Sequence, residues 1–230
     1  MTEKVKTYIV VGNKIWNKNI FEEKIRKYSG KWFYFNNIDN FTDEFLKNIN
    51  PQYIFFLHWS LLVPAHVFEN YECVCFHMTD VPFGRGGSPL QNLIVRGFHS
   101  TKLTAFRMVH ELDAGPVYQK KDLSLEGNAE EIYIRATYLS TDMILDIIMN
   151  EPKPIPQSGE VVIFKRRTPD QSEMKHFENL QSLYDHIRML DAESYPTAYF
   201  IHNGFRYEFS RAAIYEGKII SNVIITKVDD

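Results

Sequence analysis

Short apolar segments alternate with amphipathic segments through the first two thirds of the chain, and this alternation constrains the fold more than any other feature. The apolar segments are rich in aromatic and β-branched residues, as buried strands are, and the segments between them carry apolar residues at helical spacing. The first four predicted strands cover residues 6–12, 31–36, 53–58 and 74–77. Parallel neighbours need a crossover connection, usually a helix. The sequence therefore predicts an α/β fold, with a Rossmann-like, mostly parallel twisted sheet and helices on both faces.

The same patterns place the other elements of this region. Helices are predicted at residues 17–28, 43–49 and 89–96, the last with Ser88 as its N-cap, and a short helix or turn is predicted at residues 64–70. Two further strands are predicted at residues 102–109 and 116–125. Asn128 and Glu131 form a reciprocal capping pattern, which predicts a long helix that ends near residue 149.

A domain boundary is predicted where the chain becomes rich in proline. Three prolines within residues 151–156 cannot continue a helix, so we expect one domain over residues 1–150 and a second over residues 151–230. The second domain reads as small and α+β, with a helix at residues 179–190 and β-rich sequence that contains an Asn203–Gly204 hairpin signal. We expect it to serve substrate binding, dimerisation or both, and hairpin edges favour a homodimer.

Composition excludes several classes of partner. The 26 basic and 29 acidic residues give a net charge of −3, and no long run of either sign predicts a nucleic-acid partner. The longest apolar run is interrupted by His58 and Ser60 and is too short to span a bilayer, so no membrane partner is predicted. The chain has two cysteines, at spacing that does not suit a disulfide, and it shows no signal peptide near its first residue; both features favour the cytoplasm.

Two cofactor classes are also disfavoured. The first predicted strand is followed by a single glycine, Gly12, where a dinucleotide fingerprint has three, so we do not expect a nicotinamide cofactor. Cys73, Cys75 and His77 share one face of a strand, but three such residues span about 13 Å. One zinc ion cannot bridge that length, so no metal site is predicted.

The best candidate for a functional residue is His77, at the end of a buried strand and before a glycine-rich loop. Sites in α/β proteins lie at the carboxyl ends of strands. Simpler interpretations stay open, because a strand-end histidine is often structural, the glycines at 84, 86 and 87 could either bind an anion or only allow a tight turn, and Asp113 could cap a turn.

Taken together, these residues resemble the formyltransferases that use 10-formyltetrahydrofolate. That family carries Asn-x-His, then Ser-Leu-Leu-Pro and Arg-Gly-x-x-Pro, and later an aspartate in Asp-Ala-Gly-Pro. The positions that match the first group are His77, Thr79, Pro82, Arg85, Gly86 and Pro89. Residues 113–116, Asp-Ala-Gly-Pro, match the second group at a similar separation.

The tail resembles the sugar-nucleotide branch of this family, at residues 164–172, 184–191 and 195–196. This likeness implies a formyl transfer from 10-formyltetrahydrofolate to the amino group of a UDP- or dTDP-linked amino sugar, on a route related to pseudaminic acid. A methionyl-tRNA or other amine formyltransferase, a formyltetrahydrofolate hydrolase and a folate-binding non-enzyme stay open as alternatives.

The resemblance also implies roles for individual residues. His77 would accept the amine proton or, when protonated, stabilise the oxyanion, and Asp113 would orient it and stabilise its charged form. Cys75 stands where the family has its asparagine, and a thiol is the weaker donor. Asn92, His58 or a backbone N–H of the glycine loop could compensate.

Two groups of residues are expected to bind ligands on the same basis. The cofactor group comprises His58, Trp59, Pro82, Gly84, Arg85, Gly86, Leu112 and Asp113. The substrate group comprises Thr79, Lys165, Arg166, Arg167 and Tyr195, with the cations as candidates for the pyrophosphate because guanidinium groups bind phosphate well.

Overall fold

The computed structural model describes residues 5–193 and 195–228. The chain forms two compact units, each assembled from separate stretches of sequence. The first unit holds the described residues up to Arg85 together with residues 102–123 and 134–163, and the second holds residues 86–101, 124–133 and the described residues from Phe164 on. The predicted domain boundary after residue 150 stays a prediction.

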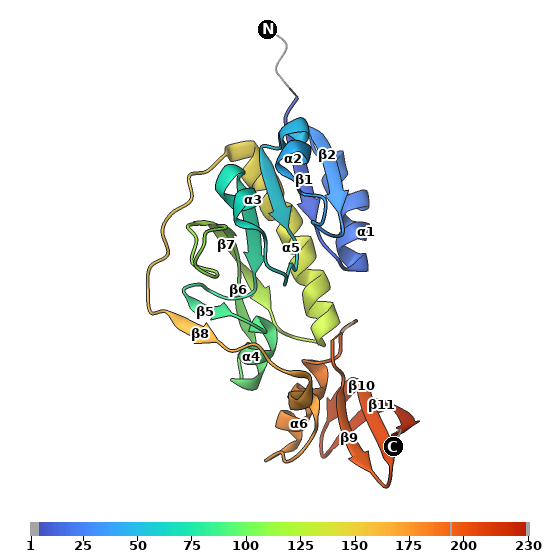
Figure 1. The fold of residues 1–230 in the computed structure, drawn as a ribbon. Coiled ribbons are helices and arrows are strands. Elements are labelled where there is room, and N and C mark those ends of the chain that lie inside the picture. Colours follow the sequence, from blue (N-terminus) through green and yellow to red (C-terminus); the bar gives the residue numbers. More distant parts are fainter. Residues whose placement is uncertain (1–4, 194, 229–230) are drawn as a thin grey trace. The chain divides into compact units, whose positions relative to one another are not determined.

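The first unit is built on a six-stranded sheet, which confirms the predicted fold class (Figure 1). The strands follow the order β2-β1-β3-β4-β6-β7. Their bounds are β1 Thr7–Val11, β2 Lys31–Phe35, β3 Tyr53–Phe56, β4 Cys73–His77, β6 Ser100–Arg107 and β7 Val117–Ser124. The pairs β1–β2, β1–β3 and β3–β4 are parallel, whereas β6 runs antiparallel to β4 with His77 opposite Thr104.

Helices cover both faces of this sheet. Their bounds are α1 Ile15–Glu23, α2 Asp43–Ile49, α3 Ala65–Asn70 and α5 Ala129–Asn150. Leu46 of α2 and Val67 of α3 pack on the face that carries Ile9 and Cys73. Right-handed crossovers put α1 on the opposite face. There, Nδ2 of Asn17 in α1 donates to the hydroxyl of Thr137 in α5 at 3.4 Å.

The local helix signals were partly right. The capping pair is confirmed, because Asn128 N donates to Glu131 Oε2 and Glu131 N donates to Asn128 Oδ1, both at 2.9 Å. The single helix predicted at residues 17–28 is wrong: α1 ends at Glu23, and a 3₁₀ turn, η1 (Ile25–Lys27), buries Ile25 with tighter spacing before β2 begins.

The second unit contains the helices α4 Pro89–Val95 and α6 Leu180–Arg188 and the 3₁₀ turn η2 Pro169–Ser172. Its antiparallel sheet has the order β11-β10-β9, with bounds β9 Ala198–His202, β10 Phe205–Tyr215 and β11 Lys218–Lys227. Asn203 and Gly204 both have positive φ, as the predicted two-residue hairpin requires. Homodimerisation through this sheet is an untested prediction.

Ser88 does not cap α4 in the predicted way. It has φ 49° and its side chain makes no capping bond to the helix. Instead, its hydroxyl oxygen accepts a bond from Arg167 N at 3.0 Å. The sequence also predicts a strand at residues 161–165, and β8 (Val162–Phe164) confirms it. Its partner in a two-stranded sheet, β5 (Phe83–Gly86), was not predicted and precedes α4 in the chain.

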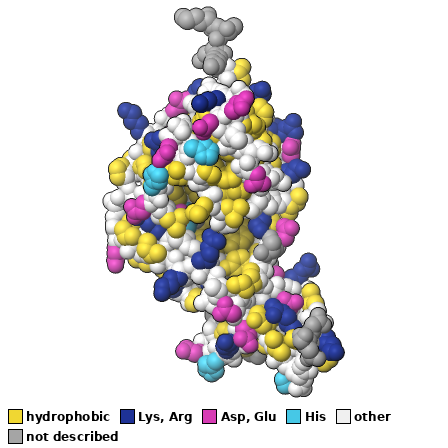
Figure 2. Space-filling model, in the orientation of Figure 1, with side chains coloured by type: hydrophobic (Ala, Val, Ile, Leu, Met, Phe, Trp, Pro, Cys, Tyr) yellow, Lys and Arg dark blue, Asp and Glu magenta, His cyan; other side chains and the backbone are white. Residues whose placement is uncertain are grey.

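Two surface properties bear on partners. No helix among residues 5–193 and 195–228 has the length and apolar composition needed to cross a membrane. On the face drawn in Figure 2, basic and acidic side chains are interspersed.

Candidate active site

His77, the last residue of β4, is nearly buried, with 9% of its side chain exposed. Its Nε2 lies 2.8 Å from the carbonyl oxygen of Gly84. A carbonyl oxygen can only accept, so Nε2 carries the hydrogen in this arrangement. The ring meets Phe106 edge-on, with centroids 6.4 Å apart. The imidazole is therefore held in one orientation, and Nδ1 remains for chemistry.

Asp113 supplies the charge that faces this nitrogen. Its Oδ2 lies 3.8 Å from His77 Nδ1, within the range of an ion pair, and 12% of its side chain is exposed. Its backbone adopts the left-handed region at φ 53°, which aspartate tolerates better than most residues. The structure thus brings together the two residues that the sequence paired, although they are far apart in the chain.

The loop that carries Asp113 is packed closely against β6. A Cβ atom on Gly115 would lie 1.6 Å from the carbonyl oxygen of Arg107, so glycine is required for this approach. Arg107 N donates to the carbonyl of Pro116 at 2.9 Å. The Asp-Ala-Gly-Pro motif is therefore explained in part by backbone geometry. Leu112, in the same loop, is 63% exposed and presents an apolar surface.

Arg85 is buried and is engaged within the protein. Its Nη1 donates to Glu111 Oε1 at 2.9 Å, and its Nε and Nη2 donate to Gln157 Oε1 at 3.0 and 2.8 Å. Gln157 was missed by the sequence interpretation, because it lies in the proline-rich segment that was treated as a boundary. Binding of a cofactor by Arg85 stays a prediction; the contacts observed are internal.

The loop after β4 is held by its own hydrogen bonds. The hydroxyl of Thr79 donates to the carbonyl of Gly84 at 3.2 Å, so this carbonyl accepts from both Thr79 and His77. The carbonyl of Thr79 in turn accepts from Thr104 Oγ1 at 2.7 Å. Pro82 is buried, and its carbonyl accepts from Val162 N at 3.2 Å. Thr79 is fully buried, so its predicted contact with a substrate gains no support from its position.

Cys75 lies on the same strand face as His77 and is partly buried. Burial raises the pKa of its thiol well above the usual range, and the nearby Asp113 carboxylate raises it further. The thiol is therefore neutral near pH 7 and can act as a weak donor, whereas thiolate chemistry is disfavoured. Cys73 is fully buried in the core.

His58 follows β3 and has φ 49°. Its Nδ1 lies 3.2 Å from both Asn17 Nδ2 and Thr137 Oγ1. Burial lowers the pKa of His58 to about 4, with Lys14 adding to the effect, so the ring is neutral near pH 7 and Nδ1 accepts. Trp59 packs edge-on against Phe56.

Asn17 was missed by sequence reasoning. A Cβ on Gly12 would lie 2.8 Å from the Cβ of Asn17, so Asn17 packs directly against this glycine. The single glycine after the first strand was the available signal.

Gly86 and Gly87 of the glycine-rich loop lie in the second unit, where the absence of a side chain allows close packing. A Cβ on Gly86 would lie 2.4 Å from the carbonyl oxygen of Phe164, and one on Gly87 would lie 2.4 Å from Arg166 Cβ. The carboxamide of Asn92 donates to the carbonyls of Gly87, Ser88 and Lys165 at 3.0–3.1 Å. These bonds occupy the amide that was proposed to compensate for Cys75.

The predicted substrate-binding cations lie in this same unit. Lys165 and Arg166 are exposed, whereas Arg167 is half-buried and donates to the carbonyl of Gln171. The hydroxyl of Tyr195 lies 3.4 Å from Ser88 Oγ. Contacts of these residues with a substrate stay predictions. Within the described chain, no three His, Cys, Asp or Glu side chains are placed to hold a metal ion.

Comparisons with known proteins agree on one family. The family described as "Methionyl-tRNA formyltransferase, C-terminal domain" matches residues 169–226. A solved structure of a methionyl-tRNA formyltransferase from Clostridium thermocellum is 45% identical, with a TM-score of 0.91, and the alignment covers 97% of this chain and 100% of that one. A methionyl-tRNA formyltransferase of Thermodesulfovibrio yellowstonii is 24% identical over 81% of this chain, which spans 62% of that relative.

A more distant structure shares the fold alone. HypX from Aquifex aeolicus, solved in complex with tetrahydrofolic acid, has a TM-score of 0.71 at 15% identity, over 89% of this chain and 37% of HypX.

These matches correct two predictions. The predicted acceptor, a nucleotide-linked amino sugar, is wrong, because the 45% identical structure and the matching relative are named for methionyl-tRNA, whereas structures named as sugar N-formyltransferases are 14–18% identical and share the fold alone. The predicted absence of a nucleic-acid partner is wrong for the same reason. The tail segments that suggested the sugar branch overlap the matched C-terminal domain, and a net charge describes the whole chain rather than one surface.

Proposed function

This chain belongs to the formyltransferase family, and we propose that it transfers the formyl group of 10-formyltetrahydrofolate to the amino group of methionyl-tRNA. The single observation that carries the proposal is the close approach of His77 Nδ1 and Asp113 Oδ2 at the carboxyl end of β4. A ring nitrogen held next to a carboxylate can accept a proton from an attacking amine. Both side chains keep a small exposed fraction, so a substrate can reach them.

The proposed reaction is direct acyl transfer. The amino nitrogen attacks the formyl carbon, the new C–N bond forms as the carbonyl becomes an oxyanion, and the bond to N10 then breaks to release tetrahydrofolate. His77 Nδ1 takes the proton that the amine loses, and the proton passes to N10 of the leaving group. The imidazolium that forms faces the Asp113 carboxylate at ion-pair distance from Nδ1, and the Gly84 carbonyl accepts from Nε2. Such placement commonly contributes ~10²–10⁴ in rate.

The site residues suit the folate donor in a limited way. Leu112 offers an exposed apolar side chain beside Asp113, and His58 and Trp59 follow the neighbouring strand β3. We propose that these residues line the place of the pterin. Cys75 contributes a neutral S–H near the carboxylate, a weaker donor than the family's asparagine. A cytoplasmic location is part of the proposal.

The direct test is a formylation assay with the purified chain, 10-formyltetrahydrofolate and methionyl-tRNA. We expect formyl-methionine after deacylation, detected by the mass gain of one formyl group, and no product with tRNA that carries no amino acid. Release of formate at the same rate with and without acceptor would identify a hydrolase instead. Neither product, with folate binding intact, would indicate a non-enzymatic folate-binding protein, and both outcomes would overturn the proposal.

A further inference from the structure

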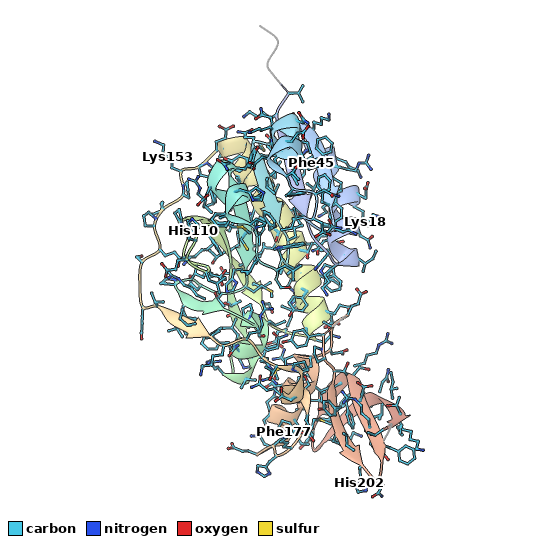
Figure 3. The ribbon with its side chains drawn as sticks, viewed as in Figure 1. Lys18, Phe45, His110, Lys153, Phe177 and His202 are labelled. Carbon is cyan, nitrogen blue, oxygen red and sulfur yellow. The ribbon has the colours of Figure 1, made fainter. Side chains whose placement is uncertain are left out.

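The proline-rich segment of residues 151–163 follows α5 and runs as an extended strap on the outside of the first unit (Figure 1). Most of its side chains are exposed, and Figure 3 shows Lys153 on it. Backbone hydrogen bonds at two places hold the strap. Ile155 and Val117 exchange hydrogen bonds at 2.7 and 2.8 Å, and Val162 N donates to the carbonyl of Pro82 at 3.2 Å.

Between these two tethers, the side chain of Gln157 turns inward and uses every polar atom it has. Its Oε1 accepts from two nitrogens of Arg85, and its Nε2 donates to the carbonyls of Asp113 and Gly115 at 2.8 and 2.9 Å. The orientation of the amide is fixed by chemistry, because a guanidinium only donates and a carbonyl only accepts. Gln157 therefore joins the loop after β4 to the loop that carries Asp113.

The two loops need such a connection. Asp113 has a left-handed backbone at φ 53°, and the carboxylate faces His77 at 3.8 Å, a distance that a small rotation of the loop would change. Glu111 and Gly115 are attached on either side, through Arg85 and through the packing against Arg107. Gln157 is the one side chain among these contacts that holds the backbone of Asp113 itself.

We infer that Gln157 is a positioning residue of the formyl-transfer site, which fixes the Asp113 carboxylate relative to His77. The strap of residues 151–163 is then part of the working site rather than a linker between domains. The kinetic part of this inference rests on the proposed function, whereas the structural part does not.

The variants separate the two halves of the amide. Gln157→Glu keeps the acceptor for Arg85 but cannot donate to the carbonyls of Asp113 and Gly115, and Gln157→Met removes both functions without adding a charge. Gln119→Glu is the matched control, because Gln119 is a half-buried glutamine of the same unit whose amide donates to the carbonyl of Met143 at 2.9 Å. We expect both Gln157 variants to lose at least tenfold in kcat with the KM for the folate within about threefold. In the Gln119→Glu control, kcat and the KM for the folate should both stay within twofold of wild type.

A double-mutant cycle with Asp113→Asn tests whether Gln157 acts through Asp113. Residual rates are measured under single-turnover conditions at high enzyme concentration. We expect Gln157→Met to have less than a twofold effect in the Asp113→Asn background, because the carboxylate that it positions is already lost. If the two losses multiply, Gln157 acts elsewhere and the inference is wrong.

Hydrogen exchange gives a readout that does not depend on activity. We expect the peptide of residues 111–116 to exchange at least tenfold faster in Gln157→Met than in wild type, and to be unchanged in Gln119→Glu. If exchange is faster in Gln157→Met but the wild type does not formylate methionyl-tRNA, Gln157 still positions Asp113 and the proposed function is overturned. If the wild type is active but Gln157→Met changes neither the exchange nor kcat, only the positioning role of Gln157 is overturned.

Discussion

Cys75 departs from the family pattern, and its surroundings define what it can do. Burial and the Asp113 carboxylate both raise the pKa of the thiol, so the S–H form dominates near neutral pH. A thiolate nucleophile at this position is disfavoured, and the oxyanion would receive a weaker hydrogen bond than a carboxamide gives. Direct transfer between amine and folate is therefore the mechanism that suits this residue.

The alkylation rate of Cys75 tests its protonation state. We expect the thiol to react with iodoacetamide at pH 8 at least tenfold more slowly than free cysteine, because a raised pKa reduces the thiolate fraction. A Cys73→Ala variant isolates the signal of Cys75, and the urea-unfolded variant supplies the control for full reactivity. Labelling as fast as that of free cysteine, or capture of a formyl thioester, would contradict this account.

His58 should give the fold an acid sensitivity. Its pKa is about 4 in the folded chain against an ordinary 6.5, so below pH 6.5 the unfolded chain binds a proton that the folded chain does not. The free energy of unfolding should then fall as the pH decreases from 6.5 to 4, by at most about 3 kcal/mol from this group. Asparagine tolerates a positive φ, so His58→Asn is the suitable variant.

Urea denaturation at pH 7 and pH 4.5 measures this effect. We expect the loss of stability between the two pH values to be smaller in His58→Asn than in wild type. The comparison uses the difference between pH values, since the substitution also removes bonds to Asn17 and Thr137. An identical pH dependence in the two proteins would show that His58 titrates normally.

At the level of elements, the loop between β6 and β7 leaves no room for a side chain at Gly115. We expect Gly115→Ala to lower the free energy of unfolding by roughly 3 kcal/mol, because its Cβ overlaps the carbonyl oxygen of Arg107 and the backbone must move. Gly97→Ala is the control. Gly97 has φ 77° and no atom near its Cβ position. The substitution should therefore lower the free energy of unfolding by only about 1 kcal/mol, from backbone strain. Equal losses in chemical denaturation would refute the steric argument.

The strands were predictable from sequence because their signals are local. β1, β3 and β4 are runs of apolar residues, and the Asn128–Glu131 cap is a pattern four residues long. The antiparallel direction of β6 and the pairing of β5 with β8 depend on contacts between distant segments, which periodicity does not encode. Gln157 was missed for the same reason: a glutamine among prolines gives no local indication that it holds two loops.

For the whole molecule, the two wrong partner predictions have different causes. A net charge of −3 averages over the surface and says little about a local set of cations. His77 and Asp113 were found from a motif and then brought together by the fold, whereas no comparable motif identified the acceptor. The reaction could thus be inferred from the sequence more readily than the substrate.

The exposed cations Lys165 and Arg166 allow a test of tRNA binding. If they contact tRNA phosphates, Lys165→Gln combined with Arg166→Gln should raise the KM for methionyl-tRNA about tenfold and weaken its salt dependence. The KM for 10-formyltetrahydrofolate should stay within twofold. Lys218→Gln combined with Lys227→Gln, which removes two exposed cations of β11, is the control. An equal effect of both pairs would point to overall charge rather than a contact.

His77 and Asp113 are proposed to act together in formyl transfer. The most direct measurement is the single-turnover rate of formyl transfer from 10-formyltetrahydrofolate to methionyl-tRNA by wild type, His77→Asn and Asp113→Asn, with thermal unfolding recorded for each protein. We expect transfer by wild type and a loss of ~10²-fold or more in both variants, with unfolding temperatures close to that of wild type. Full transfer by either variant, or none by the wild type, would contradict this proposal.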